Sequence, residues 1–154
     1  MLASTPSLLR AVLPSASIGW CFDRPRFGAE FVPDFLLAHF NSAGYHWVLV
    51  ELESPTHPAL TQAGRMSGKV TEAMRQIGDW RAWLRENIAY AQRQLGFEGI
   101  NAEIPAVVIV GRRSELDAKH TARYRELSMT ERLSVMTYDR LVEAAIDLVD
   151  RGTQ

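Results

Sequence analysis

The chain has 154 residues, of which 47% are apolar and 23% are charged, and its formal net charge is −1. This length predicts one domain with a sizeable core. The near-neutral charge excludes a polycationic nucleic-acid binder, so any DNA contact must come from a local basic patch. The single cysteine, Cys21, excludes a disulfide framework and a cysteine-based zinc site, and it favours a reducing cytoplasm. No apolar run approaches the ~20 residues of a membrane span.

The first half of the chain predicts a helix and then three strands. A short amphipathic helix is expected within residues 1–15, and the core of the single domain, 1–154, follows over about 17–150. The strands are expected at residues 17–22, 31–40 and 45–52. Asn41-Ser42-Ala43-Gly44 is a hairpin signal between the last two. The third strand, YHWVLVEL, is nearly continuous in apolar residues, which suits a central strand covered on both faces.

The second half predicts helices that alternate with buried strands. After a loop rich in proline and glycine, a long helix is expected over about 69–94, with an apolar stripe at steps of three and four. The later elements expected are a strand at 106–110, a polar helix capped by Ser114 and ending near Leu127, a short strand at 133–137 and a final helix from about 141. Since the first strands are joined by short turns, this order predicts an α/β three-layer domain with a central mixed β-sheet flanked by helices.

Acidic residues stand where two of these strands should be buried. Asp34 lies near the beginning of the second strand, and Glu51 lies near the end of the third. Glu53 follows two residues later and therefore points to the same face as Glu51. Carboxylates in such places are costly unless a positive charge meets them, and hard divalent cations prefer oxygen ligands. The pattern predicts a site for Mg²⁺ or Mn²⁺ held by Asp34, Glu51 and Glu53. Solvated carboxylates at strand ends are an equally open interpretation.

Polar residues elsewhere could complete such a site. Gln76, beside the apolar stripe of the long helix, could contact a phosphate or a metal-bound water, and Lys69 begins the same helix, where free N–H groups favour phosphate. Arg112 and Arg113 follow the strand at 106–110 and could meet a DNA backbone. Taken singly, these positions also fit a polar helix flank and a solvated loop.

Several short segments, taken in order, resemble one protein family over residues 19–145. The segments are Phe27-Gly28, Pro33-Asp34-Phe35-Leu36-Leu37, Val50-Glu51-Leu52-Glu53-Ser54-Pro55, Ala73-x-x-Gln76-Ile77-x-Asp79-Trp80, Val110-Gly111-Arg112 and Thr137-Tyr138-Asp139-Arg140-Leu141. Together they resemble the Shedu family of anti-phage defence proteins, whose domain resembles the PD-(D/E)XK nucleases with their restriction-endonuclease-like fold. The resemblance implies that Asp34 and Glu51 are metal carboxylates and that Gln76 is the helix glutamine.

Position 53 departs from the family pattern, in which lysine is usual. Glutamate there adds negative charge beside Glu51, and it could act as a metal ligand or as a general base, while Lys69 could supply the missing positive charge. The leading hypothesis is a metal-dependent DNA endonuclease or nickase, with homo-oligomerisation expected because cutting both strands commonly needs two active sites. The alternative is a catalytically silent module of the same fold that serves DNA binding or assembly. A third interpretation, an interaction domain without any nucleic-acid role, fits the neutral charge.

Overall fold

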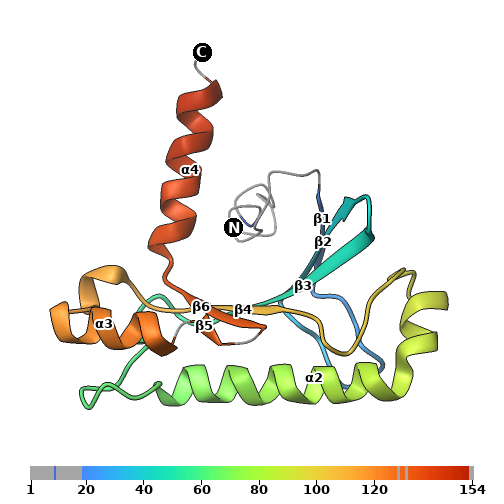
Figure 1. The fold of residues 1–154 in the computed structure, drawn as a ribbon, viewed down its shortest axis with the longest axis horizontal. Helices are drawn as coiled ribbons and strands as arrows, with labels where there is room; N and C mark the ends of the chain where they lie inside the picture. The colour runs from blue at the N-terminus through green and yellow to red at the C-terminus, as the bar shows by residue number, and fades with distance from the viewer. Residues whose placement is uncertain (1–8, 10–18, 128, 131, 153–154) are drawn as a thin grey trace.

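The computed structural model describes residue 9 and residues 19–127, 129–130 and 132–152 (Figure 1). In this part of the chain the strands are β1 (Gly19–Asp23), β2 (Phe35–Asn41), β3 (Gly44–Leu52), β4 (Ala106–Ile109), β5 (Met129–Thr130) and β6 (Leu133–Met136). The helices are α2 (Gly68–Arg93), the 3-10 helix η3 (Arg113–Glu115), α3 (Ala118–Leu127) and α4 (Asp139–Gly152). Apart from Leu9, the helix predicted within residues 1–15 lies outside the described residues.

The described strands form one mixed sheet in the order β1-β2-β3-β4-β6-β5. Strands β1, β2 and β3 pair antiparallel, and the Asn41–Gly44 pair closes the hairpin between the last two. Strands β3, β4 and β6 then pair parallel, because α2 and α3 carry the chain back between them. The predicted mixed sheet is confirmed. It brings the carboxyl ends of β3, β4 and β6 to one edge.

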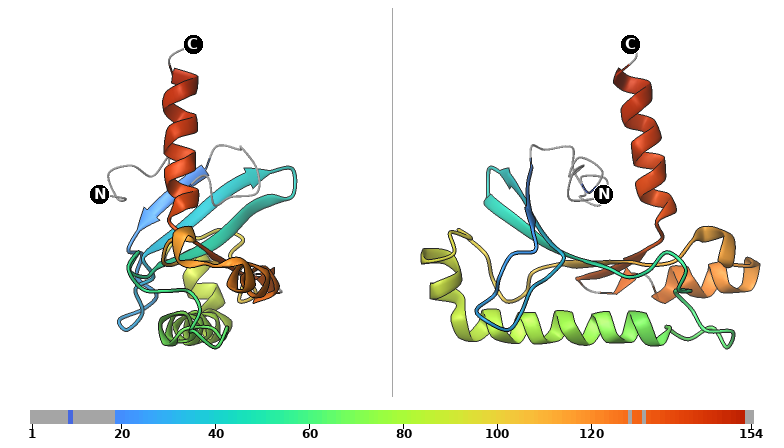
Figure 2. Two further views of the ribbon diagram at one scale, coloured as in Figure 1. Left: turned by 90° about the vertical axis from the view of Figure 1, so that its left-hand side faces the viewer. Right: turned by 180° about the vertical axis from the view of Figure 1, so that it is seen from behind.

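Helix α2 lies along one face of the sheet, and α4 rises away from the opposite face (Figures 1 and 2). Leu36 and Leu49 point toward α2 and pack with its buried residues, such as Ile77. Alternate residues of the same strands point to the other face, where they meet Leu9 and Leu141, the latter from the first turn of α4. The chain therefore has the predicted α/β restriction-endonuclease-like architecture of three layers.

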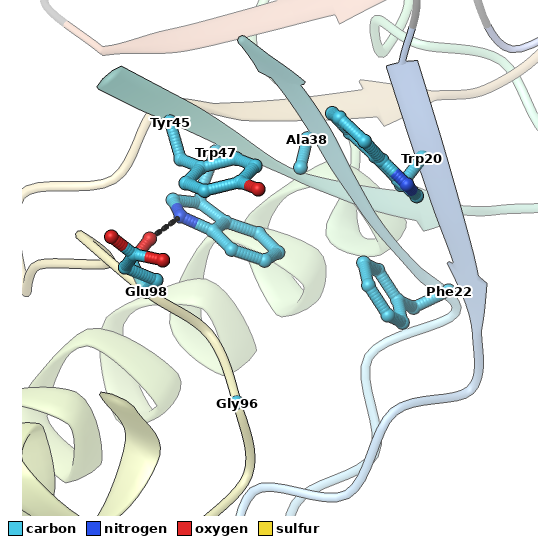
Figure 3. Close-up of a pocket in the computed structure, with 7 residues that line it drawn as sticks. All are labelled: Trp20, Phe22, Ala38, Tyr45, Trp47, Gly96 and Glu98. Atoms are coloured by element: carbon cyan, nitrogen blue, oxygen red, sulfur yellow. Dashed lines mark hydrogen bonds between the residues drawn. The ribbon is translucent and has the colours of Figure 1, made fainter. Parts of the chain in front are cut away.

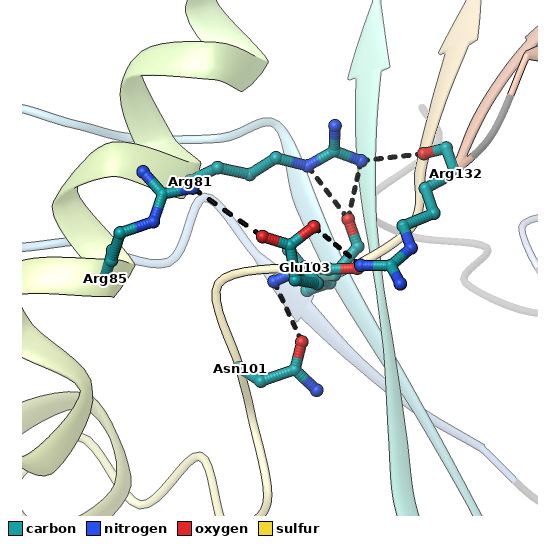
Figure 4. A network of polar contacts seen from close by, with 6 residues as sticks. Arg81, Arg85, Asn101, Glu103 and Arg132 are labelled. Atoms are coloured by element: carbon teal, nitrogen blue, oxygen red, sulfur yellow. Dashed lines mark hydrogen bonds and ion pairs between the residues drawn. The ribbon is translucent and has the colours of Figure 1, made fainter.

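Helix α2 is the longest element, and it lies along one face of the sheet (Figure 1). Ser67 is its N-cap, since its Oγ accepts a hydrogen bond from the backbone N–H of Val70 at 3.4 Å. Near the middle of the helix, Arg81 donates to the carbonyl oxygens of Ile104 and Arg132, both at 2.7 Å (Figure 4). These bonds fasten α2 to the segments that lead into β4 and β6, and so fix the helix relative to the parallel strands.

Two predicted boundaries are wrong. The polar helix begins at Ala118 rather than after Ser114, because Ser114 lies inside η3 and Asp117 takes the capping role: its Oδ1 accepts from the backbone N–H of His120 at 2.7 Å. The strand predicted at 31–40 begins at Phe35, since the segment before it forms a tight loop that a Phe27–Phe31 bridge closes. The two-residue strand β5 was not predicted, because so short a segment has no measurable periodicity.

Candidate active site

Asp34 and Glu51 lie opposite each other where the β2–β3 ladder ends. The last pair of that ladder is Phe35–Val50, and each carboxylate is the next residue outward. Because Leu36 and Leu49 face α2, the alternation of the strands places Asp34 and Glu51 on the same, helix-covered face. The antiparallel hairpin thus brings together two acidic residues that are seventeen positions apart in the sequence.

The Asp34 carboxylate continues the hydrogen bonding of the sheet beyond its last backbone pair. Its Oδ2 accepts a hydrogen bond from the backbone N–H of Leu52 at 2.8 Å, and its own carbonyl accepts one from the N–H of Arg24 at 2.9 Å. Pro33, the residue before it, has no N–H to offer to a ladder. The backbone of β3 therefore orients the Asp34 carboxylate.

The Glu51 side chain is half-buried beside this aspartate. Burial, the negative charge of Asp34 and, more weakly, that of Glu53 raise the pKa of Glu51 to about 8, although a hydrogen bond from the backbone N–H of Asp34 opposes the shift. Its Oε2 is buried without a hydrogen-bond partner. Near neutral pH this carboxyl therefore holds a proton, unless a cation arrives to replace it.

Glu53 lies at the edge of the sheet, between two groups from distant parts of the chain. Its backbone carbonyl accepts a hydrogen bond from the Tyr138 hydroxyl at 2.8 Å, and its N–H donates to the carbonyl of Ile109 at 2.9 Å. Burial raises the pKa of the Glu53 carboxyl, and the positive charge of Lys69 is the strongest opposing influence. The structure thus places Lys69 within electrostatic reach of Glu53, although its Nζ also lies 3.4 Å from Glu72 Oε2.

Gln76 lies on the sheet-facing side of α2. It is three residues beyond Ala73 and one before Ile77, both of which are buried against the sheet. Its Oε1 is buried and has no hydrogen-bond partner. Across the described residues, the buried side-chain nitrogen and oxygen atoms without a partner are one from His39, one from Glu51 and one from Gln76. Two of these three atoms therefore belong to residues predicted for the site, and a buried polar atom without a partner needs an explanation.

Gly111 and Tyr138 support the same edge, and the sequence did not single them out as site residues. Gly111 has φ +64, and a Cβ on it would lie 2.7 Å from the carbonyl oxygen of His57. Its N–H donates to the carbonyl of Ser54 at 3.2 Å, and its carbonyl accepts from the N–H of Tyr138 at 3.1 Å. A signal was present in the sequence, because Gly111 and Tyr138 follow two buried strands whose parallel pairing delivers them beside the end of β3.

The two arginines after β4 have different surroundings. Arg112 is exposed, and its charge acts on Tyr138, whose hydroxyl lies in the field of Asp34 and Glu53. Arg113 instead directs Nη1 to Glu143 Oε1 at 2.7 Å, and its backbone N–H donates to Asp139 Oδ2 at 2.6 Å. Arg113 is thus already paired within the chain, whereas in the described residues the Arg112 side chain has no such ion pair.

The carboxylates of Asp34 and Glu51 fit a hard divalent cation that keeps some of its coordination positions open. No group of three or more His, Cys, Asp or Glu side chains in the described residues is arranged to hold a metal ion. Mg²⁺, however, is commonly bound through one or two carboxylates, while waters and substrate phosphates fill its other positions. The paired Asp34 and Glu51, with the unpartnered Oε2 of the latter, fit that kind of open site.

The sequence matches the model of a known protein family. A family model described as "Shedu protein SduA, C-terminal" matches residues 1–142, which is most of the chain. No curated protein matches it. Among the described residues, no helix has both the length and the apolar composition to cross a membrane.

Proposed function

Because the chain belongs to the Shedu family, as the match over residues 1–142 shows, we propose that it is a metal-dependent DNA endonuclease or nickase. Membership of the family supports a role in anti-phage defence. The reaction proposed is hydrolysis of a phosphodiester bond of DNA, with Mg²⁺ or Mn²⁺ as cofactor.

One observation carries this proposal. The Glu51 side chain is half-buried next to Asp34, its buried Oε2 has no partner, and its pKa is raised to about 8. A fold that only needed a stable strand here would place an apolar side chain at this position, as at Leu49 on the same face. A divalent cation would satisfy the unpartnered oxygen and stabilise the charged form of both carboxylates.

Each residue of the proposed site has a separate role in binding the cation or the attacking water. Asp34 and Glu51 would hold the cation, which when bound lowers the pKa of a coordinated water and neutralises charge on the phosphate. The bond from the Leu52 N–H orients the Asp34 carboxylate for this task. Gln76 Oε1 would accept a hydrogen bond from the attacking water, since it is a buried acceptor without another partner. Glu53 would serve as the general base and not as a third metal ligand, because in the described residues no group of three carboxylates is arranged to hold a metal ion.

Glu53 suits the task of a base better than its sequence position alone suggests. Burial raises its pKa, which brings the group closer to the pH at which a carboxylate accepts a proton efficiently. Lys69, within electrostatic reach, offsets the added negative charge and offers an ammonium group to the DNA phosphate. Arg112 adds a second basic group, and Arg113 contributes only if DNA displaces Glu143. Lys69 and Arg112 would thus supply, from other positions of the fold, the positive charge that the usual lysine carries at position 53.

The alternative function is a catalytically silent module for DNA binding or assembly. The specific observation that favours it is the Asp34–Leu52 hydrogen bond, which gives the aspartate a structural reason to exist without any metal. Under this alternative Glu53 would mark the loss of the catalytic lysine, and the protein would bind DNA without cutting it.

Plasmid cleavage decides between the two. Supercoiled DNA is incubated with the protein in Mg²⁺, in Mn²⁺ and with a chelator, beside Glu51→Gln and a control variant, Glu86→Gln, which changes an exposed carboxylate of α2. A nuclease gives nicked or linear DNA with metal only, loses it in Glu51→Gln and keeps it in Glu86→Gln. If wild type and Glu51→Gln leave the plasmid supercoiled in every condition, the silent module is correct.

A further inference from the structure

A small pocket opens on the α2-facing side of the sheet (Figure 3). It encloses about 120 Å³ and is lined by Trp20, Phe22, Ala38, Tyr45, Trp47, Gly96 and Glu98. Along β3, Tyr45 and Trp47 lie six and four residues before Glu51, roughly 20 Å and 13 Å at ~3.3 Å per residue. Phe22 lies nearer to the carboxylates, since it pairs with Leu36, two residues from Asp34. None of the residues of the candidate active site lines the pocket, which extends from Phe22 toward the turn between β2 and β3.

Four aromatic rings form most of its wall. Figure 3 shows Trp20 and Phe22 on β1 and Tyr45 and Trp47 on β3, with the segment after α2 along one side. The rings support one another, since the centroids of Trp20 and Tyr45 lie 5.6 Å apart and those of Phe22 and Trp47 lie 5.8 Å apart. Trp20 nevertheless remains 45% exposed and Phe22 36% exposed. Large apolar side chains gathered around an open hollow are typical of a binding site.

The charge of the pocket is negative. Glu98 is the charged residue of the lining, it is exposed, and no ion pair joins its carboxylate to another described residue. The lining contains no lysine or arginine that could meet a phosphate, and the indole N–H of Trp47 already donates to the Glu98 carbonyl at 2.8 Å. Aromatic ring faces and a free carboxylate both attract cations.

The size and shape of the pocket favour an ammonium group over a guanidinium group or a larger ligand. Sites for drug-sized ligands have volumes of about 300–1,000 Å³, so a hollow of about 120 Å³ accepts the head of one side chain and not a cofactor. The planes of Trp20 and Tyr45 meet at 63°, which makes a corner and not a flat platform. A planar guanidinium stacks best on a flat face, whereas a compact ammonium on a flexible stem fits a corner.

We propose that this pocket binds an alkylammonium group, presented as the lysine side chain of a basic polypeptide partner. The rings would surround the ammonium, and the Glu98 carboxylate would neutralise its charge. The pocket gives the protein a protein-recognition site between β1 and the segment after α2, and this site does not depend on the proposed nuclease activity.

The indole N–H resonances of the full chain test this by NMR. The probe is a short glycine-serine peptide with one lysine, compared with the same peptide in which norleucine, an uncharged analogue of similar length, replaces the lysine. The lysine peptide should shift the signals of Trp20 and Trp47, leave those of Trp80 and Trp83 on α2 unchanged, and bind about tenfold more tightly than the norleucine peptide.

Substitutions in and outside the pocket test whether the lysine peptide binds there. Trp20→Ala and Glu98→Gln should each weaken the lysine peptide several-fold, while Tyr90→Ala, which removes a comparably exposed ring (47%) outside the pocket, should not. An unchanged Trp80 signal would show that the variants are folded; the Trp83 signal cannot serve for Tyr90→Ala, because the two rings lie 6.3 Å apart between centroids. Equal binding of the norleucine peptide would overturn the proposal, because the site would then be merely apolar. So would the absence of any shift, or stronger shifts of the same two indoles with a single-stranded oligonucleotide.

Discussion

The Asp34 carboxylate accepts a hydrogen bond from the backbone N–H of Leu52 at 2.8 Å, one residue beyond the last pair of the β2–β3 ladder. The bond gives Asp34 both a structural role and a fixed orientation. Any substitution at this position therefore changes the sheet as well as the candidate metal site, and the two effects must be separated before a loss of activity can be interpreted.

The first prediction separates them with two variants of Asp34. Asp34→Ala leaves the partly buried N–H of Leu52 without its partner and should lower the free energy of unfolding by about 1–3 kcal/mol. Asp34→Asn keeps an acceptor oxygen and should stay within about 1 kcal/mol of wild type, yet lose metal-dependent cleavage, because an uncharged amide is a poor ligand for Mg²⁺. Urea denaturation and plasmid cleavage measure the two effects. Full cleavage by Asp34→Asn would exclude the aspartate as a metal ligand.

The second prediction concerns pH and the metal-free protein. The pKa of Glu51 is about 8 in the folded protein, against an ordinary value of 4.5, so the folded state binds the proton more tightly than the unfolded state. The stabilisation from protonated Glu51 is complete below the ordinary value and is lost as the pH rises to about 8. Unfolding in chelator should therefore become easier between about pH 6.5 and 8.

A second group sets the lower limit of that pH range. The pKa of His39 is lowered from 6.5 by burial and by the neighbouring His46, so its contribution to stability is lost only as the pH falls below 6.5. Glu51→Gln has no proton to lose, and its stability should vary less than that of wild type over the same range. Parallel curves for the two proteins would contradict the raised pKa.

Much of the fold could be predicted from the sequence, because apolar periodicity reports burial directly. The stripe of α2 and the run of β3 set those elements within a residue or two, and the hairpin at Asn41–Gly44 followed from its turn residues. The start of α3 could not be predicted, since Ser114 and Asp117 are both good caps and tertiary contacts decide between them. Only the fold shows which of the two is used.

Some contacts of the candidate site could likewise be predicted from the sequence, and others could not. The pairing of Asp34 with Glu51 followed from adjacent strands, whereas the approach of Tyr138 to Glu53 spans 85 residues and depends on the parallel order of β3, β4 and β6. The pairing of Arg113 with Glu143 was equally invisible, because it joins a loop to α4. Which of two neighbouring arginines faces the site is a property of the packed fold.

The third prediction tests the support that Gly111 gives to this edge. Gly111→Ala places a Cβ 2.7 Å from the His57 carbonyl oxygen and also strains a backbone with φ +64, so it should destabilise the protein by more than ~2 kcal/mol and reduce cleavage. Gly96→Ala is the matched control. It has φ +76 but open space around the added Cβ, so only the strain of about 1–2 kcal/mol remains. Equal losses in the two variants would show that close approach at Gly111 does not matter.

The fourth prediction distinguishes the two arginines after β4. Arg112→Gln should weaken DNA binding and reduce the slope of log affinity against log salt by about 0.9, the value for one phosphate contact. Arg113→Gln should change both less, because its guanidinium already lies 2.7 Å from the Glu143 carboxylate. Fluorescence anisotropy of a labelled duplex across a range of salt concentrations measures the slope. A larger effect of Arg113→Gln would mean that DNA displaces Glu143.

The last prediction concerns Glu53, the position at which an active nuclease and a silent module differ. If Glu53 is the general base, Glu53→Gln should lower the cleavage rate by about 10²–10⁴ and remove the rise of the rate with pH that its deprotonation causes. Glu53→Lys restores the residue usual in the family but places a second ammonium near Lys69, so it should bind DNA more tightly and cut at least as fast as Glu53→Gln. Plasmid cleavage over a range of pH, with the DNA affinity of each variant measured beside it, separates binding from chemistry. An inactive wild type together with an active Glu53→Lys would reverse the assignment, because the glutamate would then be the change that silenced an otherwise intact site.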